Sequence, residues 1–500
     1  MPGLRRGWFG WALVAFFPSI VSAEDVPPGP RDGVPPGTAP AGTVPVHPGS
    51  DAAPANPAPP PPAEAPTRTD PRTSDIEQAN PTVRIEPRIR ELEQRLRAVE
   101  DKRALERHEA DRIAADKSRN VGLAVAYSQE GVGIVSSDGK FQFRFRPILQ
   151  VDARFFVQGG TNTFLLRRVR PAIEGTLFEY FDWRFMPELA GTPNVQDAFV
   201  NVRPLKELQL RAGKFVPPVG LERLAIDSDV VLPERGLPTN LVPDRDIGIQ
   251  LHGEILGGTL TYAAGVFNGA GDGVNGDNDD NDKKDIAGRI FVRPFQPLFI
   301  APLRKLGMGV AATNGVHVGA LPPFRTPDGT AFFRFEEGVA AGGTHRRIAP
   351  QANYYVGPLG LFAEYTQSTQ IVVAPGTSFR LSHDAWQVVG SFFLTGEDAS
   401  YTPVTPKHAL DPRTFGTGAI ELVARYGELR VDNDAFRGGF ALADKSARKA
   451  TEWGVGINWH MARNVKLMVN YGHTRFEGGA SGGGDRPAEM LILSRLQAAY

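Results

Sequence analysis

The sequence predicts an all-β protein: a 16-stranded antiparallel transmembrane β-barrel, preceded by a disordered Pro-rich spacer and a short coiled-coil helix. Three observations lead to this fold class. Apolar and polar residues alternate over long stretches of residues 121–500, the alternating segments are even in number, and their connections alternate between tight turns and long loops.

Composition excludes several classes of protein. The 500 residues carry 55 Lys or Arg and 56 Asp or Glu, so the net charge of −1 excludes a wholly basic nucleic-acid binder. Hydrophobic residues make up 41% and charged residues 22%, which is too polar for a helical membrane protein. Cysteine is absent, which excludes disulfides, thiolate nucleophiles and Cys-ligated metals.

The first 23 residues are typical of a secretory signal peptide. Arg5 and Arg6 precede an apolar stretch, and Val21-Ser22-Ala23 supplies small residues for cleavage. A membrane anchor is the alternative, but Pro18 and Ser19 leave its apolar core too short. The sequence therefore predicts export from the cytoplasm.

Residues 24–83 are rich in Pro and Ala, as in PANPAPPPPAEAP at 54–66. Such a segment buries too little apolar surface to offset its chain entropy, so we expect a disordered, extended spacer. It is either a plain linker or a segment that contacts the cell wall.

A helix is predicted over residues 84–118, where Arg, Glu, Leu and Ala dominate. Apolar residues follow a heptad spacing at Ile85, Ile89, Leu92, Leu96 and Val99. The heptad pattern then stops, because the next two positions are Arg103 and Glu106. The segment is either a short periplasmic coiled coil or a single solvated helix.

The barrel is predicted to occupy residues 121–500. In the segment 141–157 the alternate residues from Phe141 to Val157 are mostly apolar, and those between them include Arg144, Asp152 and Arg154. A two-residue period held for so long predicts a strand, and its apolar face is expected to meet lipid.

Sixteen such segments can be placed. They lie at about 141–157, 163–178, 181–189, 195–203, 208–215, 247–255, 258–267, 286–295, 307–316, 348–357, 359–370, 383–396, 417–429, 451–460, 463–476 and 488–500. Short connections at Gly357-Pro358 and Ala462-Arg463-Asn464 alternate with long ones such as 216–246 and 430–450. Short turns on one rim and long loops on the other are typical of an outer-membrane barrel.

Several segments, in order, resemble the phosphate-selective porin O and P family. They include FLLRRVRPAIEGTLFEYFDWRFMPEL (164–189), RAGKFVPPVGLE (211–222), PDRDIGIQLHGE (243–254), AGRIFVRPF (287–295) and GINWHMARNVKLMVNY (456–471). The resemblance implies an outer-membrane homotrimer of 16-stranded barrels. It also implies a lumen narrowed by inward loops and lined by basic residues that pass phosphate or polyphosphate, and barrels of this kind often carry a periplasmic coiled coil.

Alternation assigns the basic residues that would line the anion pathway. Arginine suits this role because its planar donors pair with two phosphate oxygens and its charge persists at any working pH. The candidates are Arg144, Arg146, Arg154, Arg168, Arg170, Arg184, Arg203, Arg211, Lys214, Arg289 and Arg293. Arg425 also falls on the inward face, and we expect the long loop that Lys214 and Arg223 flank to fold into the lumen.

A structural role is the alternative for each of these arginines. Glutamates also fall on inward positions, at Glu174, Glu188, Glu254, Glu364, Glu421 and Glu452, and Arg–Glu pairs brace barrel walls. A general or differently selective diffusion porin therefore remains open. So does a structural protein that ties the outer membrane to the cell wall through the N-terminal segment.

No enzymatic, cofactor or metal role is predicted. HExxH and GxSxG motifs are absent. The acidic loop 271–285 spaces Asp277, Asp279 and Asn281 like a calcium loop, but it lacks the Gly and Glu that complete one. The expected partners are outer-membrane lipid, phosphate or other anions and further copies of the chain, with the spacer and helix in the periplasm.

Overall fold

The computed structural model describes residues 82–119, 122–128, 131–279, 281–298 and 301–500. These residues fall into two compact units, one containing helix α1 and the other containing the strands. The predicted signal peptide and most of the Pro-rich spacer lie outside the described residues. Within the described ranges, no helix combines the length and apolar character needed to cross a bilayer.

Helix α1 spans Thr82–Arg119 and agrees closely with the predicted range. Its described side chains are exposed, including Leu92 and Leu96 of the heptad pattern. Arg95 and Glu91 form an i, i+4 ion pair at 2.8 Å, the kind of contact that supports a solvated helix. Whether α1 forms a coiled coil stays a prediction.

The strand unit is built from twenty strands with short helical turns between some of them. The strands are β1 Leu123–Ser128, β2 Gly131–Ser136, β3 Phe141–Gln158, β4 Thr163–Leu177, β5 Phe181–Glu188, β6 Asn194–Val202, β7 Gln209–Phe215, β8 Asp246–Ile255, β9 Leu260–Phe267, β10 Asp285–Val292, β11 Gly307–Ala320, β12 Phe324–Arg325, β13 Ala331–Phe333, β14 Ala340–Val356, β15 Leu359–Ala374, β16 Thr377–Phe393, β17 Ala419–Arg430, β18 Ala447–Ala462, β19 Val465–Gly478 and β20 Glu489–Ala499. The short helices are α2 Leu221–Leu224, η1 Leu237–Leu241, η2 Leu256–Gly258, η3 Ala301–Leu303, α3 Asp434–Arg437 and η4 Ser481–Gly483.

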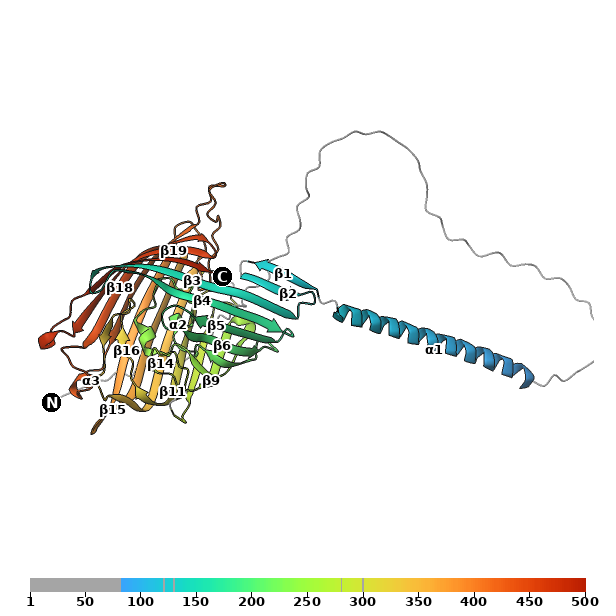
Figure 1. The fold of residues 1–500 in the computed structure, drawn as a ribbon, viewed down its shortest axis with the longest axis horizontal. Coiled ribbons are helices and arrows are strands. Elements are labelled where there is room, and N and C mark those ends of the chain that lie inside the picture. The colour runs from blue at the N-terminus through green and yellow to red at the C-terminus, as the bar shows by residue number, and fades with distance from the viewer. Residues whose placement is uncertain (1–81, 120–121, 129–130, 280, 299–300) are drawn as a thin grey trace, which may run out of the picture. The chain divides into compact units, whose positions relative to one another are not determined.

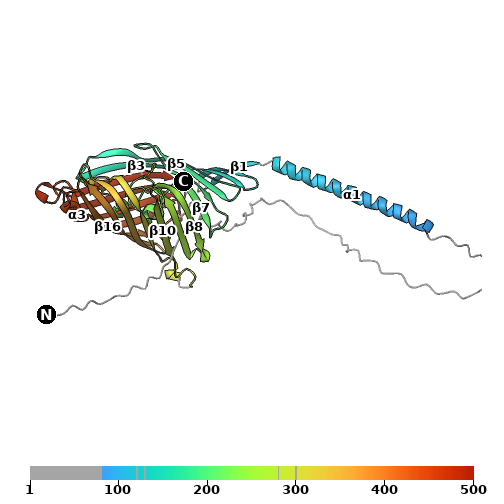
Figure 2. The same ribbon diagram turned by 90° about the horizontal axis from the view of Figure 1, so that it is seen from below.

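Sixteen of these strands close into an antiparallel barrel, as the sequence predicted (Figures 1 and 2). Each strand from β3 onward pairs with the next one in sequence, apart from the separate β12–β13 hairpin. Closure comes from β20, whose residues 490–499 pair with residues 148–158 of β3. Because every edge is paired, the backbone hydrogen bonds are satisfied in a lipid environment.

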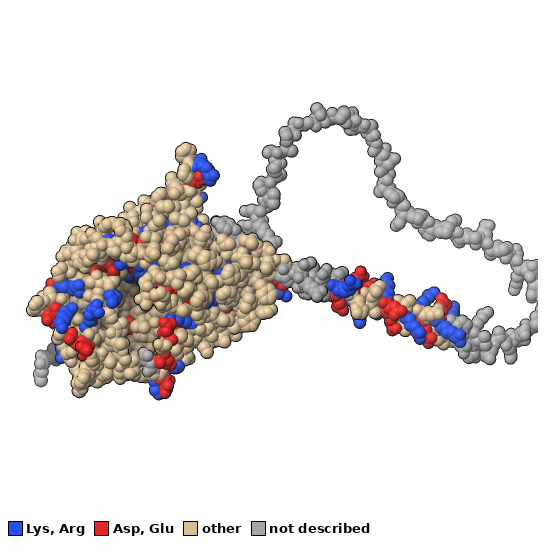
Figure 3. Space-filling model, in the orientation of Figure 1, with Lys and Arg blue, Asp and Glu red and all other residues tan. Residues whose placement is uncertain are grey.

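The two faces of the wall differ as the alternation predicted. Outward apolar side chains such as Phe155, Val455 and Ile457 are exposed, whereas the inward Gln150 and Asp152 are fully buried. Figure 3 shows that the visible flank of the barrel carries few charged side chains. The polar residues are therefore inside the barrel, where neighbouring wall residues and inward loops can pair with them.

A hairpin that the alternation did not predict extends the wall below the closing strand. Strands β1 and β2 pair with each other, and residues 132–135 of β2 pair with residues 142–145 of β3. This hairpin occupies the part of β3 that β20 does not reach (Figure 1). Its segments are short and rich in Gly, Ala and Val, which makes their alternation weak.

The two rims differ less regularly than expected. Most long loops do lie on one rim, but the connection 375–376 on that rim is a two-residue turn. On the opposite rim, residues 394–418 form a long connection between β16 and β17. Loop length alternates along the chain with these exceptions.

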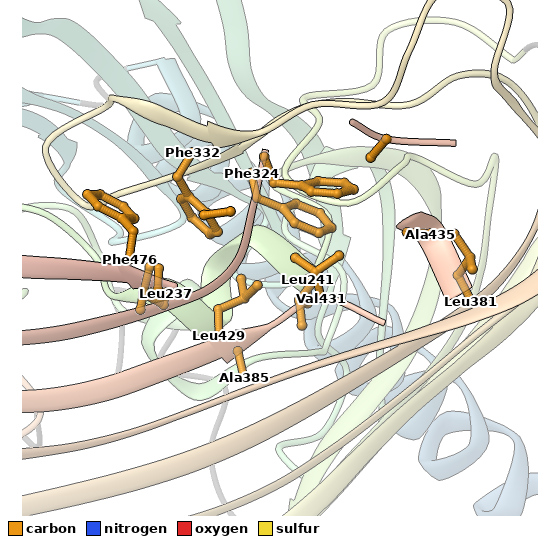
Figure 4. Close-up of a cluster of buried hydrophobic side chains, with 14 of the residues drawn as sticks. Leu237, Leu241, Phe324, Phe332, Leu381, Ala385, Leu429, Val431, Ala435 and Phe476 are labelled. Carbon is orange, nitrogen blue, oxygen red and sulfur yellow. The ribbon is translucent and has the colours of Figure 1, made fainter. Parts of the chain in front are cut away.

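An apolar cluster fills part of the barrel near the long-loop rim. Phe324, Phe332 and Phe333 of the β12–β13 hairpin pack against Leu237 and Leu241, with wall residues around them (Figure 4). All five side chains are almost completely buried. One side of the lumen is thus filled like a protein core, which leaves the polar space on the side of β3–β8.

Candidate functional site

The long connection between β7 and β8, residues 216–245, folds into the lumen, and we call it the inner loop. Its backbone carbonyls accept hydrogen bonds from wall side chains around much of the barrel. The pairs are Gln150 to Asp227 at 3.2 Å, Gln497 to Ser228 at 3.0 Å, Asn458 to Val231 at 2.7 Å, Lys466 to Ser228 at 3.2 Å and Arg425 to Glu234 at 2.7 Å. Since buried carbonyls need partners, these donors fix the path of the loop.

Asp227 of the inner loop is the centre of one charge cluster. Its carboxylate pairs with Arg168 at 3.1 Å and with Arg245 at 3.7 Å. It also contacts Arg170 and Arg235 directly. Burial opposes ionisation, but the surrounding arginines outweigh it and hold the pKa of Asp227 well below its usual range. The carboxylate is therefore charged at any physiological pH.

Glu234 is the centre of a second cluster on the same loop. It accepts hydrogen bonds from Arg167 and Arg154 of the wall, the latter at 3.0 Å, and from Arg495 of the closing strand at 2.6 Å. Again burial is outweighed by the arginines, and the pKa of Glu234 lies well below its usual range. Arg495 also pairs with Asp152 at 2.6 Å, so the cluster joins the loop to the closing seam.

A polar cavity of about 310 Å³ lies between the inner loop and the wall of β4–β6, and we call it the basic cavity. Six of its lining residues are arginines and three are carboxylates. The arginines are Arg167, Arg168, Arg170, Arg223, Arg235 and Arg245, and the carboxylates are Glu188, Asp227 and Asp244. The excess of positive charge inside low-dielectric walls favours anions over cations.

A second cavity of about 120 Å³ lies below the first along the wall of β4–β7, and we call it the mixed cavity. Asp227 and Arg245 line both cavities. Its charged lining is balanced, with Arg144, Arg184, Arg211 and Arg245 against Glu174, Asp182, Asp197 and Asp227. Apolar side chains of the wall and of the inner loop form the rest.

Most of the predicted basic residues lie inside the barrel wall, and most of them are ion-paired. Arg168 and Arg170 line the basic cavity, while Arg144, Arg184 and Arg211 line the mixed one. The carboxylate partners are Glu174 for Arg144, Arg146 and Arg184; Glu234 for Arg154; Glu188 for Arg170; Asp182 for Arg203; and Asp277 for Lys214. Bracing and lining are thus combined in the same side chains.

Three predicted residues lie away from both cavities. Arg289 is buried on β10, where it donates to Gln351 at 3.0 Å and faces the ring of Phe291. Arg293 follows the end of β10, and Arg203 follows the end of β6. The alternation was extended past the strand ends at these last two positions, where it no longer fixes the side-chain direction.

Sequence reasoning missed Arg167, which it placed on the lipid face. The register of β3 and β4 shifts at this point, because Gln150 pairs with Arg168 while the next residue of β3, Val151, pairs with Leu166. Arg167 is the extra residue of this β-bulge, so its side chain reaches Glu234 inside the barrel. Arg235 and Arg245 were missed because they lie on the inner loop, which has no periodicity.

The acidic loop forms ion pairs with its surroundings. Asp277 contacts Lys214 and Asp279 contacts Lys284. Asp272 pairs with Arg347 at 2.6 Å and accepts a hydrogen bond from Ser368, also at 2.6 Å. Within the described ranges, no group of three or more acidic or histidine side chains could hold a metal ion.

Comparisons with known proteins agree on the class of barrel. The family model described as phosphate-selective porin O and P matches residues 141–485. The chain is 23% identical to Porin O of Pseudomonas aeruginosa over 422 residues, which is 75% of this chain and 92% of that one.

Solved outer-membrane structures are similar at low identity. The outer membrane channel DcaP of Acinetobacter baumannii is 10% identical, with a TM-score of 0.48, and the match covers 76% of this chain and all of that one. An anion-selective porin from Comamonas acidovorans is 12% identical, with a TM-score of 0.47, over 72% of this chain and all of that one.

Proposed function

Because the chain belongs to the phosphate-selective porin O and P family and is an outer-membrane porin, we propose that anions cross it through the basic cavity. The observation that carries this proposal is the excess of arginine over carboxylate in that cavity. Phosphate is the first candidate solute, because paired guanidinium groups match its oxygens and several partial sites allow an ion to be handed onward. No energy source is involved, so the anion moves down its gradient.

The inner loop supports the selectivity of this pathway. It supplies Arg223, Arg235 and Arg245, while the facing wall supplies Arg167, Arg168 and Arg170. An anion entering the cavity meets donors from both sides. The carboxylates Asp227 and Glu234 share these donors, which limits the depth of the binding site and keeps the anion exchangeable.

The ion pairing of the arginines favours one alternative, a porin with weaker selectivity. If the carboxylates neutralise most of the positive field, small anions and cations would differ only modestly in permeability. The two versions share the barrel and the path, and they differ in one measurable ratio.

Three further points belong to this proposal. The barrels form a homotrimer in the outer membrane, as family resemblance implies. Helix α1 and the spacer lie in the periplasm, where α1 helps hold the chains together as a coiled coil. The spacer acts as a linker, and contact with the cell wall is its alternative role.

Single-channel current in a planar bilayer tests the proposal. With a potassium chloride gradient, we expect a reversal potential on the anion side and a chloride current that added phosphate blocks. Arg168→Gln and Arg170→Gln should each weaken the phosphate block about tenfold, since each removes one charge-assisted contact. Arg430→Gln is the matched control, because Arg430 is exposed and does not line either cavity. Equal permeability of chloride and potassium would refute anion selectivity and leave a general porin, while folded protein without any channels would favour a structural tether.

A further inference from the structure

Apolar side chains gather at one place on the inner wall where the alternation predicts polar ones. They lie in the mixed cavity and come from both of its sides: Ile148, Met186, Phe199 and Phe215 from the wall, and Leu224 and Ile226 from the inner loop. Part of their surface packs the loop against the wall, since Ile148 and Met186 form a small buried cluster that Ile226 contacts. The space that remains between them is the mixed cavity.

An arginine borders this apolar space. The guanidinium of Arg211 lies 4.4 Å from the centre of the Phe199 ring and 5.6 Å from that of Phe215. Such stacking leaves the edge of a guanidinium free to donate hydrogen bonds in its own plane. The cavity therefore combines an aromatic wall with a donor that suits an anionic group.

The mixed cavity continues from the basic cavity. Arg245 and Asp227 line both, so a solute that leaves the arginines of the first cavity passes these two residues to reach the second. The volume of the mixed cavity is about 120 Å³, and an apolar cavity of about 150 Å³ takes a benzene ring. A single ring therefore matches the space, and an anionic group attached to it would remain beside Arg245.

We propose that the two cavities together form a binding site for small organic anions that carry one aromatic ring, such as an aryl phosphate or an aryl carboxylate. The inference rests on the proposed anion pathway and names the solute class of its lower half. The anionic group pairs with arginines at the junction, and the ring is buried between Phe199 and Ile226. An inorganic anion uses only the first of these interactions.

Block of the chloride current by two phosphate monoesters tests the idea on the full-length protein in a planar bilayer. Phenyl phosphate and methyl phosphate carry the same anionic group and differ in the ring. We expect half-block by phenyl phosphate at a concentration about tenfold lower, the factor that burying much of one ring's apolar surface would give. Equal block by the two esters in an anion-selective channel would overturn this inference and leave the proposed function intact. Absence of anion selectivity would overturn both.

Variants separate the binding role of the apolar side chains from their packing role. Phe199→Ser should reduce the preference for phenyl phosphate to less than twofold and leave the block by methyl phosphate unchanged. Phe415→Ser is the matched control, because Phe415 is 90% exposed outside the cavity. If Phe199→Ser yields no channels, Ile226→Ser removes apolar surface from the other side and gives the same readout. Weakening of both esters to the same extent would show that these side chains only hold the loop.

Discussion

Asp227 illustrates how single residues set the character of the pathway. Its carboxylate touches arginines from the wall and from the inner loop, and it lines both cavities. A buried carboxylate among arginines lowers the local positive field and also orients the donors around it. The same side chain thus anchors the loop and limits how tightly an anion is held.

Replacing Asp227 with Asn should increase anion selectivity. The substitution removes one negative charge from between Arg168, Arg170, Arg235 and Arg245, so we expect the chloride-to-potassium permeability ratio to rise several-fold and phosphate block to tighten. Reversal potentials in a salt gradient measure the ratio. Asp411→Asn, which changes an exposed pair with Arg413, should leave both quantities unchanged. A lower ratio in the Asp227 variant would contradict the field argument.

Asp328, in the turn of the β12–β13 hairpin, should make hairpin docking sensitive to pH. Burial, together with the nearby Glu489 and Glu452, raises the pKa of Asp328 to about 8. A carboxyl group whose pKa is raised by folding favours the folded state at low pH, and this contribution is lost as the pH rises through the folded value. Docking of the hairpin should therefore weaken between about pH 4 and pH 8.

Limited proteolysis of the hairpin at pH 6 and pH 9 measures this effect. Wild-type protein should be cut faster at pH 9, and Asp328→Asn should make the two rates similar. Asp138→Asn is a control, since Asp138 lies in an exposed turn outside the hairpin. Equal wild-type rates at both pH values would show that ionisation of Asp328 does not affect the hairpin.

At the scale of elements, alternation predicts strands well and fails where the two-residue period is interrupted. All sixteen barrel strands were placed from their sequence pattern, because one face meets lipid and the other meets polar groups. Arg167 was assigned to the wrong face since one extra residue in β4 changes the side-chain direction. The arginines of the inner loop and the β1–β2 hairpin have no pattern of this kind, and tertiary contacts position them.

The β12–β13 hairpin should affect the amount of current and leave its selectivity unchanged. Phe332 is fully buried and packs against Phe476 at 6.0 Å between ring centres. Phe332→Ala should weaken hairpin docking by roughly 3–5 kcal/mol, the usual cost of such a truncation. Since neither residue lines the basic or the mixed cavity, single-channel recordings should show larger, noisier currents with an unchanged reversal potential. Phe415→Ala should behave like wild type, and a shifted reversal potential for Phe332→Ala would place the hairpin in the ion path.

For the whole molecule, the filled lumen is the main property. The inner loop and the apolar cluster occupy much of the interior, so the polar space runs along β3–β8. Sixteen strands can enclose a wide aqueous channel, but here side chains pack the other half like a domain core. The barrel as a whole is therefore stabilised by inward contacts as well as by its hydrogen-bonded wall.

Arg495 connects these layers, and its loss should destabilise the whole barrel. It is 1% exposed and pairs with Asp152 across the closing seam and with Glu234 of the inner loop. Arg495→Met leaves two buried carboxylates with fewer partners, at a cost of roughly 3–5 kcal/mol. The temperature at which the barrel loses its compact electrophoretic mobility should fall, whereas Lys445→Met, at an exposed and distant pair, should leave it unchanged. An unchanged temperature for Arg495→Met would show that the seam does not depend on this network.

The β1–β2 hairpin gives barrel closure a fixed end point. Residues 142–145 of β3 are already paired with β2, and the backbone N–H of Tyr500 bonds to the carbonyl of Pro147 just beyond them. When the last strand zips onto the first during insertion, it can slide no further than this stop. A one-residue slip would turn every lipid-facing side chain of β20 into the lumen. The hairpin thus acts as a ruler for assembly, because it sets the position at which the two ends of the sheet meet.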